Sequence, residues 1–191
     1  NSLDDYTEAY NTYYSDNFSL RTHFIDFLNK SEFNVFGVSS KPGIVTAGKD
    51  GWFYATKSKQ NYENAFVWND KVIKMVRKEL IKRNDWCEER GVKYYTVIVP
   101  NKMNVYPEHL PRTVFKKGET SRYDQITGLD SDPEINMIGL KETLLEHKKD
   151  KYLLFQKTDD HWTDYGAFLG YQAIMKRVEK DFPELKPQSL D

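Results

Sequence analysis

The sequence "ENAFVWNDKVIKMVRKELIKRNDWCEERGVKYYTVIVP", residues 63–100, joins a helical pattern directly to a strand pattern. Apolar side chains recur on one face of residues 63–90 and charged side chains on the other, which predicts a long amphipathic helix. The apolar face comprises Val72, Ile73, Val76, Leu80 and Cys87. Gly91 ends the helix, and residues 92–99 have the length and β-branched content of a buried strand that Pro100 stops. A helix followed by such a strand is half of an α/β repeat.

The chain after Pro100 continues this alternation. A long connection comes first, and connections of that length in a compact domain are often functional. The expected order is the connection over residues 101–134, an apolar run "INMIGL" (135–140), a helix (141–150), a strand "YLLFQ" (152–156) and a last helix (163–181). Strands that alternate with helices favour a layered α/β domain with a mostly parallel sheet.

The residues before this domain have a different pattern. Aromatic residues between Tyr6 and Leu28 recur at mostly three- and four-residue steps, which predicts an amphipathic helical segment, broken near Ser15 to Ser19. "KDG" between "IVTA" and "WFYA" predicts a hairpin turn. We therefore divide the chain into an N-terminal helical segment with a linker, residues 1–43, and an α/β domain, residues 44–191.

Composition excludes several classes of protein. The 28 basic and 29 acidic residues nearly cancel, so we expect no nucleic-acid partner. The single cysteine, Cys87, has no partner for an internal disulfide and is too little sulfur for a thiolate zinc site. No apolar run approaches the roughly 18 to 20 residues of a membrane span. Because the sequence starts at Asn1 without Met, we expect a trimmed chain that has lost an upstream signal or anchor.

The motif "KTDDHWTDYGA", residues 157–167, combines a histidine with adjacent carboxylates. In an extended segment, residues two apart point to the same side, so Asp159 lies beside His161 while Asp160 points away. The motif follows an expected strand, where open α/β sheets bind ligands. A carboxylate on one ring nitrogen orients an imidazole that takes a proton from a serine hydroxyl at the other.

Two other interpretations stay open for the motif. In one, the two acids cap the helix near Thr163 while His161 packs in a turn. In the other, Asp159, Asp160 and His161 are metal ligands. The remaining histidines, His23, His109 and His147, show no paired ligand spacing, so we predict neither a metal nor a cofactor.

Four segments occur in the order found in one family. They are "YYSDNFSLR" (13–21), "AGKDGWFY" (47–54), "VIVPNKMNVYPEHLP" (97–111) and "KTDDHWTDYGA" (157–167). With them the sequence resembles the polysaccharide O-acetyltransferases of the alginate-acetylation type, the DHHW group of the SGNH hydrolase superfamily. The resemblance implies a three-layer α/β/α fold and a Ser-His-Asp triad that transfers an acetyl group to a sugar hydroxyl through an acyl-serine.

The resemblance also assigns residues. Asp159 and His161 match the family's catalytic pair, whereas the nucleophilic serine is expected downstream of His161 in a Gly-x-Ser motif. Ser39, Ser40 and Ser189 do not match that motif. We therefore expect an SGNH-like domain that is incomplete at its C-terminus and inactive alone.

Substrate contacts are expected near the same motifs. Trp162 is a candidate sugar platform, with core packing as the alternative. Asn101, Lys102 and Tyr106 follow a strand and are candidates to face the cleft, with a structural loop as the alternative.

The resemblance implies partners and a location as well. They are a polysaccharide acceptor, an acyl donor, room for a membrane acyl-transfer partner, and an extracytoplasmic site with a tether through a removed N-terminal segment. A non-catalytic carbohydrate-binding or assembly module with the same fold is the alternative function.

Overall fold

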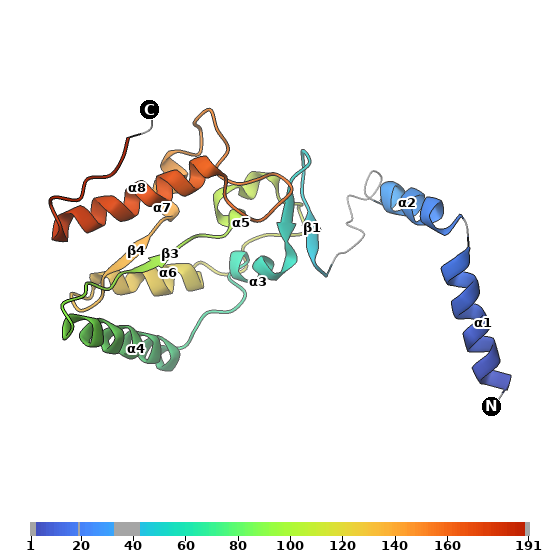
Figure 1. Ribbon diagram of the computed structural model, residues 1–191, viewed down its shortest axis with the longest axis horizontal. Helices are drawn as coiled ribbons and strands as arrows, with labels where there is room; N and C mark the ends of the chain where they lie inside the picture. The colour runs from blue at the N-terminus through green and yellow to red at the C-terminus, as the bar shows by residue number, and fades with distance from the viewer. Residues whose placement is uncertain (1–2, 19, 33–42, 190–191) are drawn as a thin grey trace.

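A computed structural model of the chain describes residues 3–18, 20–32 and 43–189 (Figure 1). The first two helices are α1 (Leu3–Asn17) and α2 (Arg21–Ser31), so the predicted break between two helical pieces is confirmed. Their aromatic side chains from Tyr6 onward are exposed, and Tyr10 stacks on Tyr14 with ring centroids 6.3 Å apart. Figure 1 draws both helices away from the α/β part of the chain. The predicted boundary at residue 43 adjoins residues 33–42, which lie outside the described residues, and it stays a prediction.

Two parallel strands form the centre of the α/β domain. Strands β3 (Thr96–Ile98) and β4 (Met137–Gly139) pair in register, with Val97 opposite Ile138. Helices α4 (Asp70–Glu88) and α6 (Arg122–Thr127) cover one face, and α7 (Lys141–Glu146) and α8 (Asp164–Asp181) cover the other (Figure 1).

The alternation of side chains along a strand explains this layering. Ile98 and Met137 point to one face and pack in a cluster with Leu80 of α4. Val97 and Ile138 point to the other face and pack in the main core, which includes Leu169 of α8. The expected three-layer α/β/α fold is thus confirmed around a two-stranded parallel sheet.

Helix α4 is shorter than predicted at its start. It begins at Asp70 rather than Glu63, because the Asn69 side chain accepts a hydrogen bond from the Val72 N–H at 3.0 Å and caps the helix there. Asn64, in the segment before it, has φ 54° and is incompatible with helix. At the other end Gly91 has φ 69°, so the predicted glycine stop is confirmed.

The expected connection after β3 is largely helical. It contains α5 (Lys102–Val105), η3 (Pro107–His109), α6 and η4 (Gly128–Ser131). The prolines shorten these helices, whereas Ser121 starts α6 through a capping box with Asp124. The segment therefore builds one side of the domain instead of crossing it as an irregular loop.

The predicted hairpin is confirmed. Strands β1 (Val45–Ala47) and β2 (Phe53–Ala55) pair antiparallel, and η2 (Thr56–Ser58) and α3 (Lys59–Tyr62) follow them. Asp50 and Gly51 both have positive φ, 56° and 76°, as a tight hairpin turn requires. Trp52 directly after the turn is 1% exposed and anchors the hairpin in the core.

The predicted strand "YLLFQ" was wrong. Only Phe155 forms a β-bridge, antiparallel to Trp162, and no β3–β4 strand pairs with this segment. The chain folds back on itself instead: the Gln156 N–H donates to His161 O at 3.0 Å, and the Thr163 N–H to Leu154 O at 2.9 Å. Residues 156–163 form the closed loop that we call the dyad loop.

Within the three described ranges, no helix has the length and apolar character needed to cross a membrane.

Candidate active site

Asp159 and His161 form a hydrogen-bonded pair at the tip of the dyad loop. Asp159 Oδ1 accepts from the His161 backbone N–H at 2.9 Å and also contacts Nδ1 of its ring. The backbone hydrogen bond and then the ring contact hold the pKa of the Asp159 carboxyl below its usual value. Because an ionised carboxylate only accepts, the contact places the ring proton on Nδ1 and leaves Nε2 as an acceptor in neutral imidazole. The His161 side chain is 85% exposed, so Nε2 is accessible.

Lys102 anchors this loop from inside the protein. Its side chain is fully buried, and Nζ donates to three backbone carbonyls: Phe53 O at 2.6 Å, Lys157 O at 2.8 Å and Asp159 O at 3.0 Å. Burial lowers the pKa of Lys102 to about 8, against the opposing charges of Asp160 and Asp159. All three N–H groups are used, so this placement does not fit the expected direct contact with a sugar.

Helix α8 fixes the other end of the dyad loop. The Thr163 hydroxyl accepts from the Gly166 N–H at 3.1 Å and donates to Leu153 O at 2.5 Å. Thr163 is therefore the N-cap of α8, and the interpretation in which Asp159 and Asp160 cap this helix was wrong. Asp159 is instead occupied by His161.

Two of the expected substrate residues occupy structural positions. Tyr106 is 4% exposed, and its hydroxyl accepts from the Leu154 N–H at 3.1 Å. Trp162 is half-buried and packs on the core, where a Cβ added at Gly170 would lie 3.1 Å from its ring. These placements match the packing alternatives, and the roles of both residues toward a substrate stay predictions.

Asn101 alone among the four lines a cavity. It lies where β3 ends, and its Oδ1 accepts from Asn104 Nδ2 at 3.0 Å. The cavity measures about 380 Å³ and also brings together Trp68, Asn104 and Arg122, which sequence analysis missed. These residues belong to no motif and meet only through the fold, so the sequence carries no local signal for them.

A nucleophile and a metal cluster were also sought among the described residues. No serine hydroxyl there hydrogen-bonds His161; Ser189 is exposed, whereas Ser39 and Ser40 lie outside the described residues. Nor do three His, Cys, Asp or Glu side chains gather in that part of the chain so as to hold a metal ion.

The fold and the site together define an α/β domain of three layers that presents an Asp-x-His pair on a closed loop. A family model described as "SGNH hydrolase-like domain, acetyltransferase AlgX" matches residues 45–190. The chain belongs to this family, as its four motifs predicted.

Relatives agree with this assignment. The chain is 28% identical over 181 residues to the probable alginate O-acetylase AlgJ of Pseudomonas syringae, covering 93% of this chain and 44% of that protein. It is 28% identical over 156 residues to the protein of the same name from Pseudomonas aeruginosa, covering 75% of this chain and 34% of that protein. The chain thus spans less than half the length of these curated relatives.

A solved structure shows the same fold. The O-acetyltransferase domain of Pseudomonas putida AlgJ superimposes with a TM-score of 0.52 at 21% sequence identity. The match covers 78% of this chain and 50% of that chain.

Proposed function

We propose that the chain is part of an enzyme that transfers an acetyl group to a hydroxyl of a polysaccharide, with His161 as general base and Asp159 as its orienting carboxylate. One observation carries the proposal: the hydrogen-bonded Asp159–His161 pair, with Nε2 accessible, lies within a domain of an acetyltransferase family. Relatives named as probable alginate O-acetylases support a polysaccharide as the acceptor.

The chemistry has two half-reactions. His161 Nε2 takes the proton of a serine hydroxyl while the serine oxygen attacks the acetyl carbonyl, and the donor leaves with that proton. The acceptor hydroxyl then gives its proton to Nε2 and attacks the acyl-serine, which restores the free serine. Asp159 stabilises the imidazolium in both steps. The proposal takes the serine from outside residues 1–191, as the resemblance implies.

The proposal includes the partners and the location. An acyl donor and a polysaccharide are required by the reaction itself, and a membrane acyl-transfer partner fits an acetyl group delivered outside the cytoplasm. We place the protein at the cell surface or in the periplasm.

A single substitution tests the base. In the intact protein, His161→Ala should lower acetyl transfer from an activated acetyl ester to an oligosaccharide by about 10²–10⁴-fold, the usual contribution of a general base. The product is measured by mass spectrometry as acetylated oligosaccharide.

His147→Ala is the matched control. His147 is also exposed and also pairs with an acid, Asp150, at 2.8 Å, but it lies in the turn after α7. It should keep full activity. Unchanged acetyl transfer by His161→Ala would show that the assignment is wrong. Oligosaccharide binding without any transfer by the unmodified protein would favour the binding-module alternative.

A further inference from the structure

The cavity beside β3 combines an aromatic ring with amides and a guanidinium. Trp68 lines it together with Asn101, Asn104 and Arg122, and the hydroxyl of Ser121 opens to the same space. Indole faces stack on sugar rings, whereas amides and hydroxyls both donate and accept hydrogen bonds, as sugar hydroxyls require. The lining therefore suits a hydrated, ring-shaped ligand better than an apolar one.

Arg122 is not satisfied by the protein around it. Its guanidinium makes one long hydrogen bond, 3.4 Å from Nη1 to Asn61 Oδ1, and lies 5.9 Å from the Trp68 ring centroid. Its Nε is buried and has no hydrogen-bond partner among the described residues. No carboxylate of those residues pairs with it. A buried donor without an acceptor is costly, so such a group calls for an explanation.

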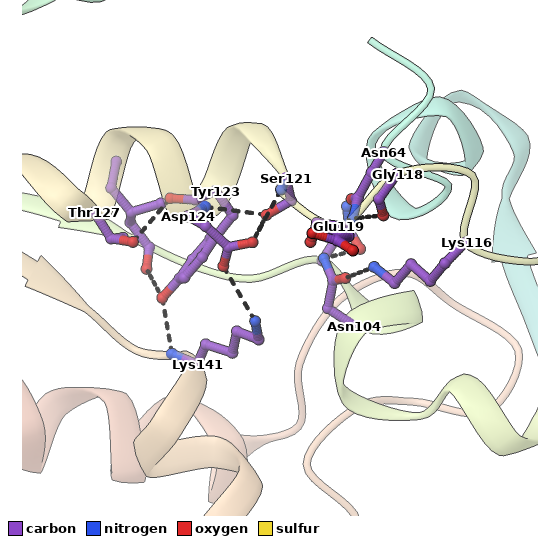
Figure 2. A network of polar contacts seen from close by, with 12 residues as sticks. Asn64, Asn104, Lys116, Gly118, Glu119, Ser121, Tyr123, Asp124, Thr127 and Lys141 are labelled. Carbon is purple, nitrogen blue, oxygen red and sulfur yellow. Dashed lines mark hydrogen bonds and ion pairs between the residues drawn. The ribbon is translucent and has the colours of Figure 1, made fainter. Parts of the chain in front are cut away.

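Two lysines add positive charge next to this cavity (Figure 2). Lys116 Nζ donates to Asn104 Oδ1 at 3.4 Å, and Lys141 Nζ pairs with Asp124 Oδ1 at 3.3 Å. In Figure 2 the two side chains extend toward Asn104 and Asp124 from opposite sides. Loss of solvent and then repulsion by Lys141 lower the pKa of Lys116, while Asp124 opposes the change. The two ammonium groups are thus close enough to repel each other.

The acids nearby do not cancel these cations. Asp124 is shared between Lys141 and the capping box of α6, where Ser121 Oγ donates to its Oδ2 at 2.6 Å. Glu119 is exposed, and its backbone carbonyl accepts from Asn64 Nδ2 at 3.3 Å. One paired carboxylate therefore faces three cations, which leaves an excess of positive charge beside a cavity with a sugar-stacking ring.

We infer that this cavity, with Arg122 and Lys116 as its charged groups and Trp68 as its stacking surface, binds a negatively charged sugar unit of the polysaccharide acceptor. The inference rests on the proposed function for the ligand's role as acceptor. A carboxylate on the sugar receives the free guanidinium N–H groups, because planar guanidinium and carboxylate groups match in geometry. Asn101 and Asn104 bind the ring hydroxyls.

Binding is measured on the intact protein without an acetyl donor, so the result does not depend on acetyl transfer. Three probes are titrated by calorimetry: an oligosaccharide with a carboxylate on every unit, a neutral oligosaccharide of equal length, and inorganic phosphate. We expect the acidic oligosaccharide to bind most tightly and to weaken with added salt. Arg122→Gln should weaken its affinity by about tenfold or more, the loss expected for a hydrogen bond to a charged group.

Variants separate the parts of the site. Arg83→Gln, an exposed arginine of α4 paired with Glu79, should leave the affinity unchanged. Trp68→Ala should weaken the acidic oligosaccharide but not phosphate. Lys116→Gln, at an exposed position, keeps the test valid if Arg122→Gln does not fold. His161→Ala should bind normally while losing acetyl transfer.

Three outcomes would overturn the inference. Equal affinity for the neutral oligosaccharide would remove the charge requirement, and an unchanged affinity in both Arg122→Gln and Lys116→Gln would place binding elsewhere. Phosphate that binds as tightly as the acidic oligosaccharide would make the cavity a site for small anions. A failure of His161→Ala to reduce transfer contradicts the proposed function and leaves this binding result standing.

Discussion

Lys102 is the residue on which the position of the dyad loop depends most directly. A buried ammonium is stable only when its hydrogens have acceptors, and here they come from two segments far apart in the sequence, Phe53 of β2 and the loop carbonyls of Lys157 and Asp159. The rings of Trp52 and Tyr54 each lie 4.9 Å from Nζ and add cation–π attraction. Lys102 therefore holds the backbone of Asp159, the residue that orients His161.

Lys102→Met should release that backbone. The methionine fills the space but offers no donors, so carbonyls lose their partners and the free energy of unfolding should fall by about 2–4 kcal/mol, measured by urea denaturation. Ring nitrogen chemical shifts of His161 should show loss of the Nδ1–H tautomer, and acetyl transfer should fall with it. Lys74→Met, at an exposed position of α4, should change none of these. Lost activity with an unchanged His161 spectrum would return Lys102 to a direct substrate role.

Helix α8 is the element that presses the dyad loop into place. A Cβ added at Gly166 would overlap the carbonyl oxygen of Leu154, so the helix approaches the loop more closely than any other residue there permits. One helical turn later, Gly170 lies against the Trp162 ring and against Leu140. The two glycines share one face of α8, and that face contacts the segments on either side of His161.

Gly166→Ala should separate this helix from the loop. We expect the free energy of unfolding to fall by about 1–3 kcal/mol, as for other overpacked sites, together with reduced acetyl transfer. Gly128→Ala is the matched control, because Gly128 has φ −60° and no atom within 4 Å of an added Cβ. Its stability should stay the same or rise by up to about 1 kcal/mol. Equal effects of the two changes in thermal unfolding would refute this role of α8.

The whole molecule buries many phenols, and this sets its response to alkaline pH. Burial and then the hydrogen bond to Asp181 raise the pKa of Tyr95 to about 12, and burial raises that of Tyr123 to about 12. Burial raises the pKa of Tyr54 further. A group with a raised folded pKa contributes stability that is present below its unfolded value near 10 and lost as pH rises toward its folded value. Lys102 has the opposite sign, because its folded pKa of about 8 lies below its unfolded value of 10.5.

The free energy of unfolding should therefore rise between about pH 8 and pH 10 and fall between about pH 10 and pH 12. Urea denaturation at a series of pH values measures both limbs. Tyr95→Phe should flatten the fall, and Lys102→Met should remove the rise. Tyr152→Phe, at an exposed position, should leave both unchanged. A steady loss of stability from pH 8 upward would contradict the assignment for Lys102.

Features confined to a few neighbouring residues were predictable from the sequence. The apolar face of α4, its stop at Gly91, the turn at Asp50 and Gly51, and the start of α8 at Thr163 each follow from local periodicity or backbone preference. The Asp159–His161 pair belongs to the same group, because residues two apart in an extended segment lie on one side whatever surrounds them.

The tertiary structure decided what each segment meets. "YLLFQ" has the composition of a strand, but its backbone groups pair with Trp162 and Thr163 instead of the parallel sheet. Lys102 and Tyr106 follow a strand as cleft residues do, yet the hairpin and the dyad loop close over them. Arg122 and Trp68 share a cavity only because α6 and the segment before α4 lie side by side. Local patterns fix helices, turns and near neighbours, whereas burial and long-range pairing depend on which surfaces the fold brings together, and no short stretch of sequence contains that information.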